Sequence, residues 1–146
     1  MGRDPSFLGT PTEVADRMLA TMPVAHPWDA QIGPFYDTPT VARLLNVTKQ
    51  AIADRARRRT LLAATTRQGK IVYPTWQFEG RRVLPEVSQA VAAFRDVPVD
   101  GWAIGSWFTT PVELLDGATP AQWLGKHRAL DPVHALAKET ANRWAR

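Results

Sequence analysis

The sequence predicts a mainly α-helical fold with a small β-hairpin, namely a winged helix-turn-helix followed by a small helical bundle. Three observations predict it. Residues 38–59 contain two short helical patterns joined at Asn46, two strand-like runs flank Gly69, and tryptophans and X-Pro helix starts recur after residue 101. We therefore divide the 146 residues into an N-terminal arm and helix (1–36), a helix-turn-helix with a β-wing (37–96) and a helical C-terminal domain (97–146).

The composition is that of a globular protein with its own core. Hydrophobic residues make up 45% of the chain, and no apolar run approaches the roughly 20 residues that cross a bilayer. The N-terminus lacks the pattern of a signal peptide, so we expect a soluble, cytoplasmic protein without membrane association. With no cysteine, the chain has no disulfide framework, no thiolate metal site and no cysteine nucleophile.

The segment before residue 38 predicts a short arm, one helix and a loop. Residues 1–9 carry few anchors, and a helix is expected over Thr10–Met22, because a capping threonine, a proline and a glutamate open it. The proline-rich stretch 23–37 predicts a loop. We expect large side chains to pin that loop to the core: Trp28, Ile32, Phe35 and Tyr36.

Two short helices are expected between residues 38 and 59. Thr38 is placed to cap the first, with Pro39 as its first residue. Asn46 tolerates the left-handed backbone that ends such a helix, and Thr48 can cap the second. Ile52 then faces inward, so that the two helices share one small core. This layout is typical of a helix-turn-helix, whose second helix lies in the major groove.

Charge is concentrated in the same part of the chain. Residues 38–82 contain ten lysines or arginines and two carboxylates, a net charge of +8, whereas the whole chain carries +4. Such a patch is expected of a surface that binds phosphates, so we predict double-stranded DNA as a partner and paired half-sites read by a homodimer. The alternative from pattern alone is an ordinary helical hairpin with a solvated charged face.

The expected DNA contacts fall into two groups, with Gln50 as the best candidate for a base contact. The first group meets base edges: Lys49, Gln50, Ala53 and Arg57. The second group meets phosphates: Thr38, Thr48, Arg55, Arg58, Arg59, Arg67 and Lys70.

A hairpin is expected directly after these helices. Leu61–Thr65 and Lys70–Tyr73 are strand-like and flank Gly69, so that Arg67 and Lys70 lie near the tip of a wing. There a positive side chain can meet phosphate or enter the minor groove.

Between the wing and the C-terminal third, the sequence predicts packing elements. We expect Trp76 and Phe78 to cover the hairpin, because this role is favoured over base stacking. Val83–Phe94 has helical spacing, and residues 95–101 form a linker.

The C-terminal third predicts a compact bundle of short helices. Helices are expected over Trp102–Phe108 and, after a turn, from Thr119 and Pro120 through Leu124. A last helix is expected over Val133–Trp144, capped by Asp131 and Pro132.

One segment of this bundle, WFTTPVELLDGATPAQWL, resembles the toxin-binding domain of Xre/MbcA/ParS-type antitoxins. The resemblance covers about the last 45 residues and rests on Trp107, Thr110, Pro111, Leu115, Gly117, Thr119, Pro120 and Leu124. It implies an antitoxin that represses its own promoter and uses residues 97–146 to cover the active-site cleft of a RES-domain toxin, which consumes NAD. The tail departs from the glycine-bearing end of that family. Its toxin-binding candidates are Asn142, Arg143, Trp144 and Arg146, which could reach an anionic nucleotide cleft or form a frayed helix end.

Two other kinds of protein remain open. One is a phage- or plasmid-type transcriptional repressor without a toxin partner, and the other is a pure protein-interaction module. An enzyme is not expected: His127, Asp131 and His134 lie close in sequence, but Pro132 breaks the helical phase between the histidines, and Asp131 suits a helix cap. No phosphate-binding glycine loop or serine nucleophile motif is present. We therefore expect no cofactor and no metal.

Overall fold

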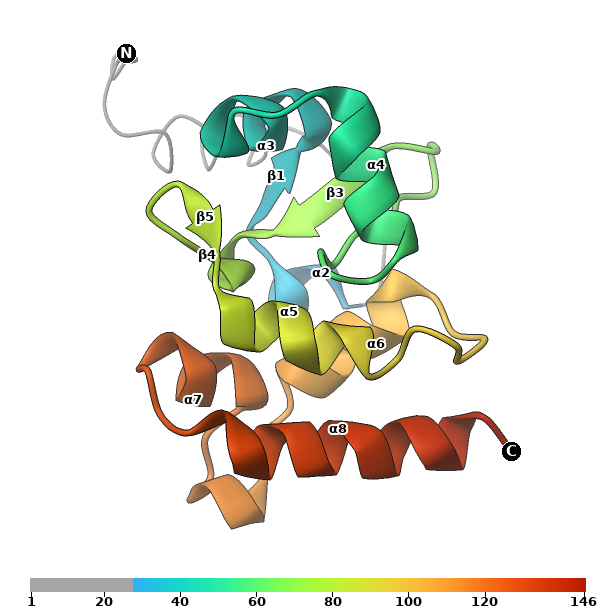
Figure 1. Ribbon diagram of the computed structural model, residues 1–146. Coiled ribbons are helices and arrows are strands. Elements are labelled where there is room, and N and C mark those ends of the chain that lie inside the picture. The colour runs from blue at the N-terminus through green and yellow to red at the C-terminus, as the bar shows by residue number, and fades with distance from the viewer. Residues whose placement is uncertain (1–27) are drawn as a thin grey trace.

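The computed structural model describes residues 28–146 and shows a mainly α-helical fold with two small antiparallel sheets (Figure 1). The predicted arm and helix before residue 23 lie outside the described residues. In chain order the elements are α2 (Asp29–Ile32), β1 (Phe35–Asp37), α3 (Thr38–Leu45), α4 (Lys49–Arg57), β2 (Ala64–Thr65), β3 (Ile71–Pro74), η1 (Thr75–Gln77), β4 (Phe78–Glu79), β5 (Arg82–Val83), α5 (Pro85–Ala92), α6 (Gly101–Phe108), η2 (Glu113–Leu115), α7 (Pro120–Gly125) and α8 (Leu130–Trp144). None of the helices in this part of the chain has the length and apolar character to span a membrane.

The larger sheet has the strand order β1-β3-β2, with both pairs antiparallel. The expected hairpin is present, because β2 pairs with β3 across a turn at Gly69, whose φ is +86°. The predicted loop over residues 23–37 is wrong for its last part, where α2 and β1 form. Strand β1 exists because it pairs with β3, 35 or more residues away, and local sequence carries no sign of such a partner.

Helices α3 and α4 follow each other in the upper part of Figure 1 and share a small core with Tyr36, Leu61 and Tyr73. Asn46 ends α3 in the left-handed conformation with φ +55°, as predicted. The cap of α3 is a correction: Asp37 accepts from Thr40 N at 2.9 Å, and Thr38 is the first helical residue. A carboxylate one position earlier makes the capping bond that the threonine was expected to make.

The larger core lies between α5 and the C-terminal helices α6, α7 and α8. Its centre is aromatic, since Phe94 contacts the rings of Trp107 and Trp144, each at a centroid distance of 5.4 Å. This core includes α5, which precedes residue 97, the first residue of the predicted C-terminal domain. Figure 1 shows α8 running beneath α5 and α6 as the lower layer of the molecule.

The starts of the C-terminal helices are partly as expected. Thr119 caps α7 in a full capping box with Gln122, which confirms the predicted start. The predicted cap of α8 is wrong, because Asp131 lies in the first turn of the helix and Ala129 occupies the cap position. A carboxylate in the first turn still interacts favourably with the helix dipole, which explains why Asp131 marks the start of a helix in the sequence.

Candidate nucleic-acid interface

The exposed face of α4 carries the four side chains that the sequence assigns to base edges. Thr48 accepts a hydrogen bond from Ala51 N at 3.1 Å and fixes the start of the helix. Ile52 is fully buried beneath, which sets the rotation of α4. All four of the assigned side chains therefore lie at the surface: Lys49, Gln50, Ala53 and Arg57.

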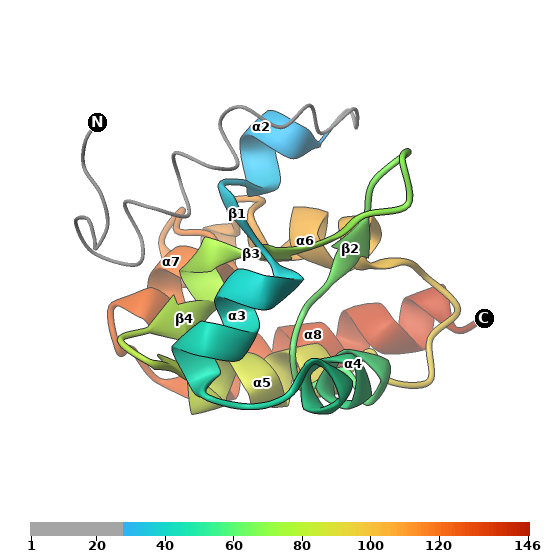
Figure 2. The same ribbon diagram turned by 90° about the horizontal axis from the view of Figure 1, so that it is seen from above.

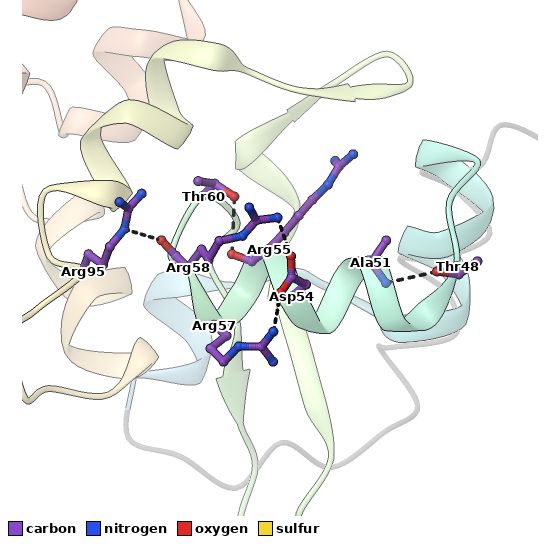
Figure 3. Close-up of polar contacts among 8 residues, drawn as sticks. All are labelled: Thr48, Ala51, Asp54, Arg55, Arg57, Arg58, Thr60 and Arg95. Carbon is purple, nitrogen blue, oxygen red and sulfur yellow. Dashed lines mark hydrogen bonds and ion pairs between the residues drawn. The ribbon is translucent and has the colours of Figure 1, made fainter.

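Asp54 lies on this face and changes its electrostatics. Its two carboxylate oxygens pair with Arg57 and Arg58, one arginine on each oxygen (Figure 3). The arginine side chains are 72% and 62% exposed. Ion pairs this exposed contribute little to stability and exchange readily for other anions. The expected open cationic surface is thus partly neutralised by one internal carboxylate.

Arg59, for which the sequence predicts a phosphate contact, is half-buried, and its guanidinium is engaged by the protein itself. It has a φ of +55°, and its guanidinium donates to three backbone carbonyls, those of Phe94, Val97 and Val99. The Arg59–Val97 distance is 2.9 Å. Burial lowers the pKa of Arg59, and the nearby carboxylate of Asp100 opposes this effect. Three of the five N–H donors of this guanidinium are therefore occupied by backbone.

Arg95 lies in the loop after α5 and forms a hydrogen bond back to the end of α4. Its Nε donates to the carbonyl of Arg58 at 2.9 Å, at the end of α4. Arg59 and Arg95 together tie the C-terminal end of α4 to the segment between α5 and α6 (Figure 3 shows the Arg95 bond).

The two threonines assigned to phosphates have structural partners. Thr38 Oγ1 lies 2.9 Å from the hydroxyl of Tyr73, in a half-buried position. Burial raises the pKa of Tyr73, and the hydrogen bond with Thr38 opposes this effect. Thr48 uses an oxygen lone pair as the cap of α4, and its O–H hydrogen is still a possible donor to phosphate.

Arg67 and Lys70 are exposed at the turn between β2 and β3. Thr66 closes this turn, since its backbone N–H donates to the carbonyl of Lys70 at 2.7 Å. Figure 2 shows the β2–β3 connection and α4 on different sides of the molecule. Arg67 and Lys70 are thus carried by a segment separate from α4.

A cationic depression that the sequence did not identify lies between α4 and the β4–β5 hairpin. This basic groove has a volume of about 330 Å³ and carries three arginines, Arg55, Arg81 and Arg82. The rest of its lining is Leu45, Thr60, Val83 and Ser88. Figure 3 shows the Arg55 side chain directed away from Arg57, so the two lie on opposite flanks of α4. The charge count included these arginines, but their convergence depends on the β4–β5 turn, which is fixed by tertiary packing.

The C-terminal tail contains both exposed and packed residues. Asn142, Arg143 and Arg146 are exposed at the end of α8. Trp144, also a predicted toxin contact, is half-buried and packs against Phe94, which anchors the helix end to the core.

The residues of the antitoxin-like segment have structural roles in this fold. Trp107 donates from Nε1 to Thr140 at 3.1 Å, Leu115 is fully buried, and Gly117 has a φ of +82°. Between them, Leu114 is 76% exposed. Among residues 28–146 no group of three potential ligands could hold a metal ion, and His127 instead meets Glu79 at 2.6 Å.

Comparisons with known proteins give one structural likeness. No family model matches the chain, and no curated protein matches it. Among solved structures the chain is similar to "NMR structure of Rv2175c", with 28% sequence identity and a TM-score of 0.63. The similarity covers 82% of this chain and 86% of that one. It supports the mainly helical fold with a small sheet.

Proposed function

We propose that this protein binds double-stranded DNA sequence-specifically, with α3 and α4 as a helix-turn-helix and the β2–β3 hairpin as its wing. The observation that carries the proposal is the construction of α4: capped by Thr48, anchored by Ile52 and exposing polar side chains along the opposite face. A helix held in this way can enter the major groove, where early residues of the second helix meet base edges.

Gln50 has the central part in this proposal, because it is exposed in the first turn of α4 and an amide can bond bidentately to adenine. A duplex selected by the protein from a random pool serves as the specific site. On that duplex, Gln50→Ala is expected to cost about 1–3 kcal/mol in binding. On random duplex it is expected to leave affinity unchanged, as measured by fluorescence anisotropy.

The matched control is Gln89→Ala, which removes the same amide from the exposed face of α5. It is expected to bind both duplexes like the wild type. An equal loss for Gln50→Ala on selected and random duplex would contradict base reading by Gln50. A wild type that leaves labelled duplex unshifted at low salt, where phosphate contacts are strongest, would contradict DNA binding altogether.

A second candidate function is that of an antitoxin whose C-terminal helices bind a toxin, a RES-domain enzyme according to the resemblance. The observation in its favour is Leu114, a highly exposed apolar side chain within the antitoxin-like segment. It borders an apolar depression with Pro132, Ala135 and Leu136 of α8. Apolar surface of this kind is common at protein–protein contacts. A transcriptional repressor without a toxin partner needs no such contact.

Co-expression with the product of the neighbouring gene tests this role. If that product is lethal alone, the wild type is expected to neutralise it and to co-purify with it. Leu114→Asp is expected to abolish both effects while DNA binding persists, whereas Gln89→Asp places the same charge on α5 and should neutralise normally. A neighbouring product that is harmless alone, or full neutralisation by Leu114→Asp, would favour the repressor without a toxin or a different contact surface.

A homodimer is part of the DNA-binding proposal, because paired reading heads double the site that is recognised.

A further inference from the structure

We infer that the basic groove between α4 and the β4–β5 hairpin binds a phosphate group of the DNA backbone, and that this hairpin is a second DNA-contacting element beside the wing. The inference rests on the proposed DNA binding. It adds Arg81 and Arg82 to the interface and gives Arg55 a defined place in it.

Arg55 supplies the free charge of the basic groove. Within residues 28–146 its guanidinium makes no hydrogen bond or ion pair, unlike those of Arg57, Arg58 and Arg59. The hydroxyls in the groove are engaged with backbone: Thr60 Oγ1 donates to the carbonyl of Arg55 at 3.4 Å, and Ser88 Oγ donates to the carbonyl of Thr60 at 2.6 Å. Guanidinium groups are therefore the donors available to an anion.

Arg81 fixes the hairpin in position. Its Nη2 donates at 3.0 Å to the carbonyl of Arg43, in the last turn of α3. The bond joins the β4–β5 turn, where Gly80 has a φ of +61°, to the helix that precedes α4. The groove is thus held between two fixed elements, which reduces the ordering cost when an anion binds.

Glu79 is a carboxylate that pairs with one member of this cluster, Arg82. Arg82 reaches Glu79 at 3.5 Å, a long and exposed contact, whereas His127 meets the other oxygen at 2.6 Å. When Arg82 turns to a phosphate, Glu79 keeps its bond to His127. Exposed pairs such as Arg82–Glu79 contribute little and yield readily to a competing anion.

The position of the groove favours a duplex over a small anion. Arg55 lies on one flank of α4 and Arg57 on the opposite flank (Figure 3). A helix in the major groove has a phosphate strand on each side, and the groove is about 12 Å wide. Arg55 and the arginines of the hairpin then meet one strand, on the flank of α4 opposite Arg57.

The test uses the full chain with the double substitution Arg55→Gln/Arg82→Gln and random-sequence duplex. The control is Lys126→Gln/Lys138→Gln, which removes the same charge from exposed positions outside the groove. Affinity is measured between 50 and 200 mM salt. Each lost phosphate contact is expected to weaken binding on the order of tenfold at 0.1 M salt and to reduce the slope of log K against log salt by about 1. The control should bind like the wild type, and circular dichroism verifies that both variants are folded.

The possible outcomes separate this inference from the proposed function. A loss confined to Arg55→Gln/Arg82→Gln supports the groove as a backbone contact. Wild-type affinity and slope for that variant, together with a specific loss for Gln50→Ala, would overturn the groove assignment and leave DNA binding intact. Saturable binding of inorganic phosphate that the double substitution abolishes, without any change on duplex, would assign the groove to a free anion instead. If the wild type binds no duplex, the proposed function itself fails.

Discussion

The α3–α4 pair and the C-terminal bundle are held in place by different kinds of interaction. The pair has a small core, and its position depends on polar contacts at its ends: the Asp37 and Thr48 caps and the bonds of Arg59 and Arg95. The bundle instead has a large core in which aromatic rings contact one another around Phe94 and Phe108. A small surface unit with many charges cannot bury enough apolar area to stand alone. The bundle therefore supports the candidate interface, and substitutions in the two regions should affect folding and binding differently.

The largest expected effect comes from the aromatic centre of the bundle. Phe94 is fully buried and touches both Trp107 and Trp144, so Phe94→Ala leaves a cavity and is expected to cost about 3–5 kcal/mol of unfolding free energy. Urea unfolding followed by tryptophan fluorescence measures this loss. Phe94→Leu keeps most of the volume and serves as the control, with a smaller loss. A loss below about 1 kcal/mol for Phe94→Ala would mean that the two regions do not depend on this core.

The next effect concerns the connection between the two regions. Arg59→Ala removes the donors of three carbonyls, including those of Phe94 and Val97, and is expected to cost about 1–3 kcal/mol of unfolding free energy. The lower end is expected, because the site is only half-buried and water can replace some of the lost bonds.

Arg59→Ala also distinguishes a structural arginine from one that binds phosphate. At a temperature where the variant is folded, its salt dependence of DNA binding is expected to equal that of the wild type. A slope reduced by about 1 would show that Arg59 meets a phosphate after all. Arg67→Ala, at the exposed β2–β3 turn, provides the contrast, because it should leave stability unchanged within about 0.5 kcal/mol.

The features that sequence predicted correctly are those fixed by near neighbours. Asn46 in the left-handed conformation, Thr48 and Thr119 as caps, and the turn at Gly69 each follow from chemistry within four residues. Strand β1 was missed because its pairing partner lies far along the chain.

In the candidate site, the structure differs from the sequence prediction where side chains find distant or unexpected partners. The inward direction of Arg59 depends on carbonyls 35 to 40 residues away, which no local pattern reveals. The pairs of Asp54 are a different case. Asp54 lies three and four residues before Arg57 and Arg58, a spacing that predicts ion pairs on a helix and could have been used.

The smallest expected effect on stability is the most informative about binding. Asp54→Asn removes the carboxylate shared by Arg57 and Arg58 and is expected to change the unfolding free energy by less than about 0.5 kcal/mol, because both pairs are exposed. Its effect on binding is expected to be larger. With two arginines released and one negative charge removed, random duplex should bind more tightly at low salt, with a salt slope steeper by about 1–2.

Glu139→Gln is the matched control for Asp54→Asn, because it removes an exposed carboxylate of α8, beside the apolar depression at Leu114. Both variants gain the same net charge, so a general electrostatic effect would appear in both, and only Asp54→Asn is expected to steepen the slope. Equal behaviour of the two variants would mean that Arg57 and Arg58 face no phosphates. A steeper slope combined with weaker binding to the selected duplex would instead show that Asp54 restrains non-specific binding, since its carboxylate repels backbone phosphates and holds both arginines away from them.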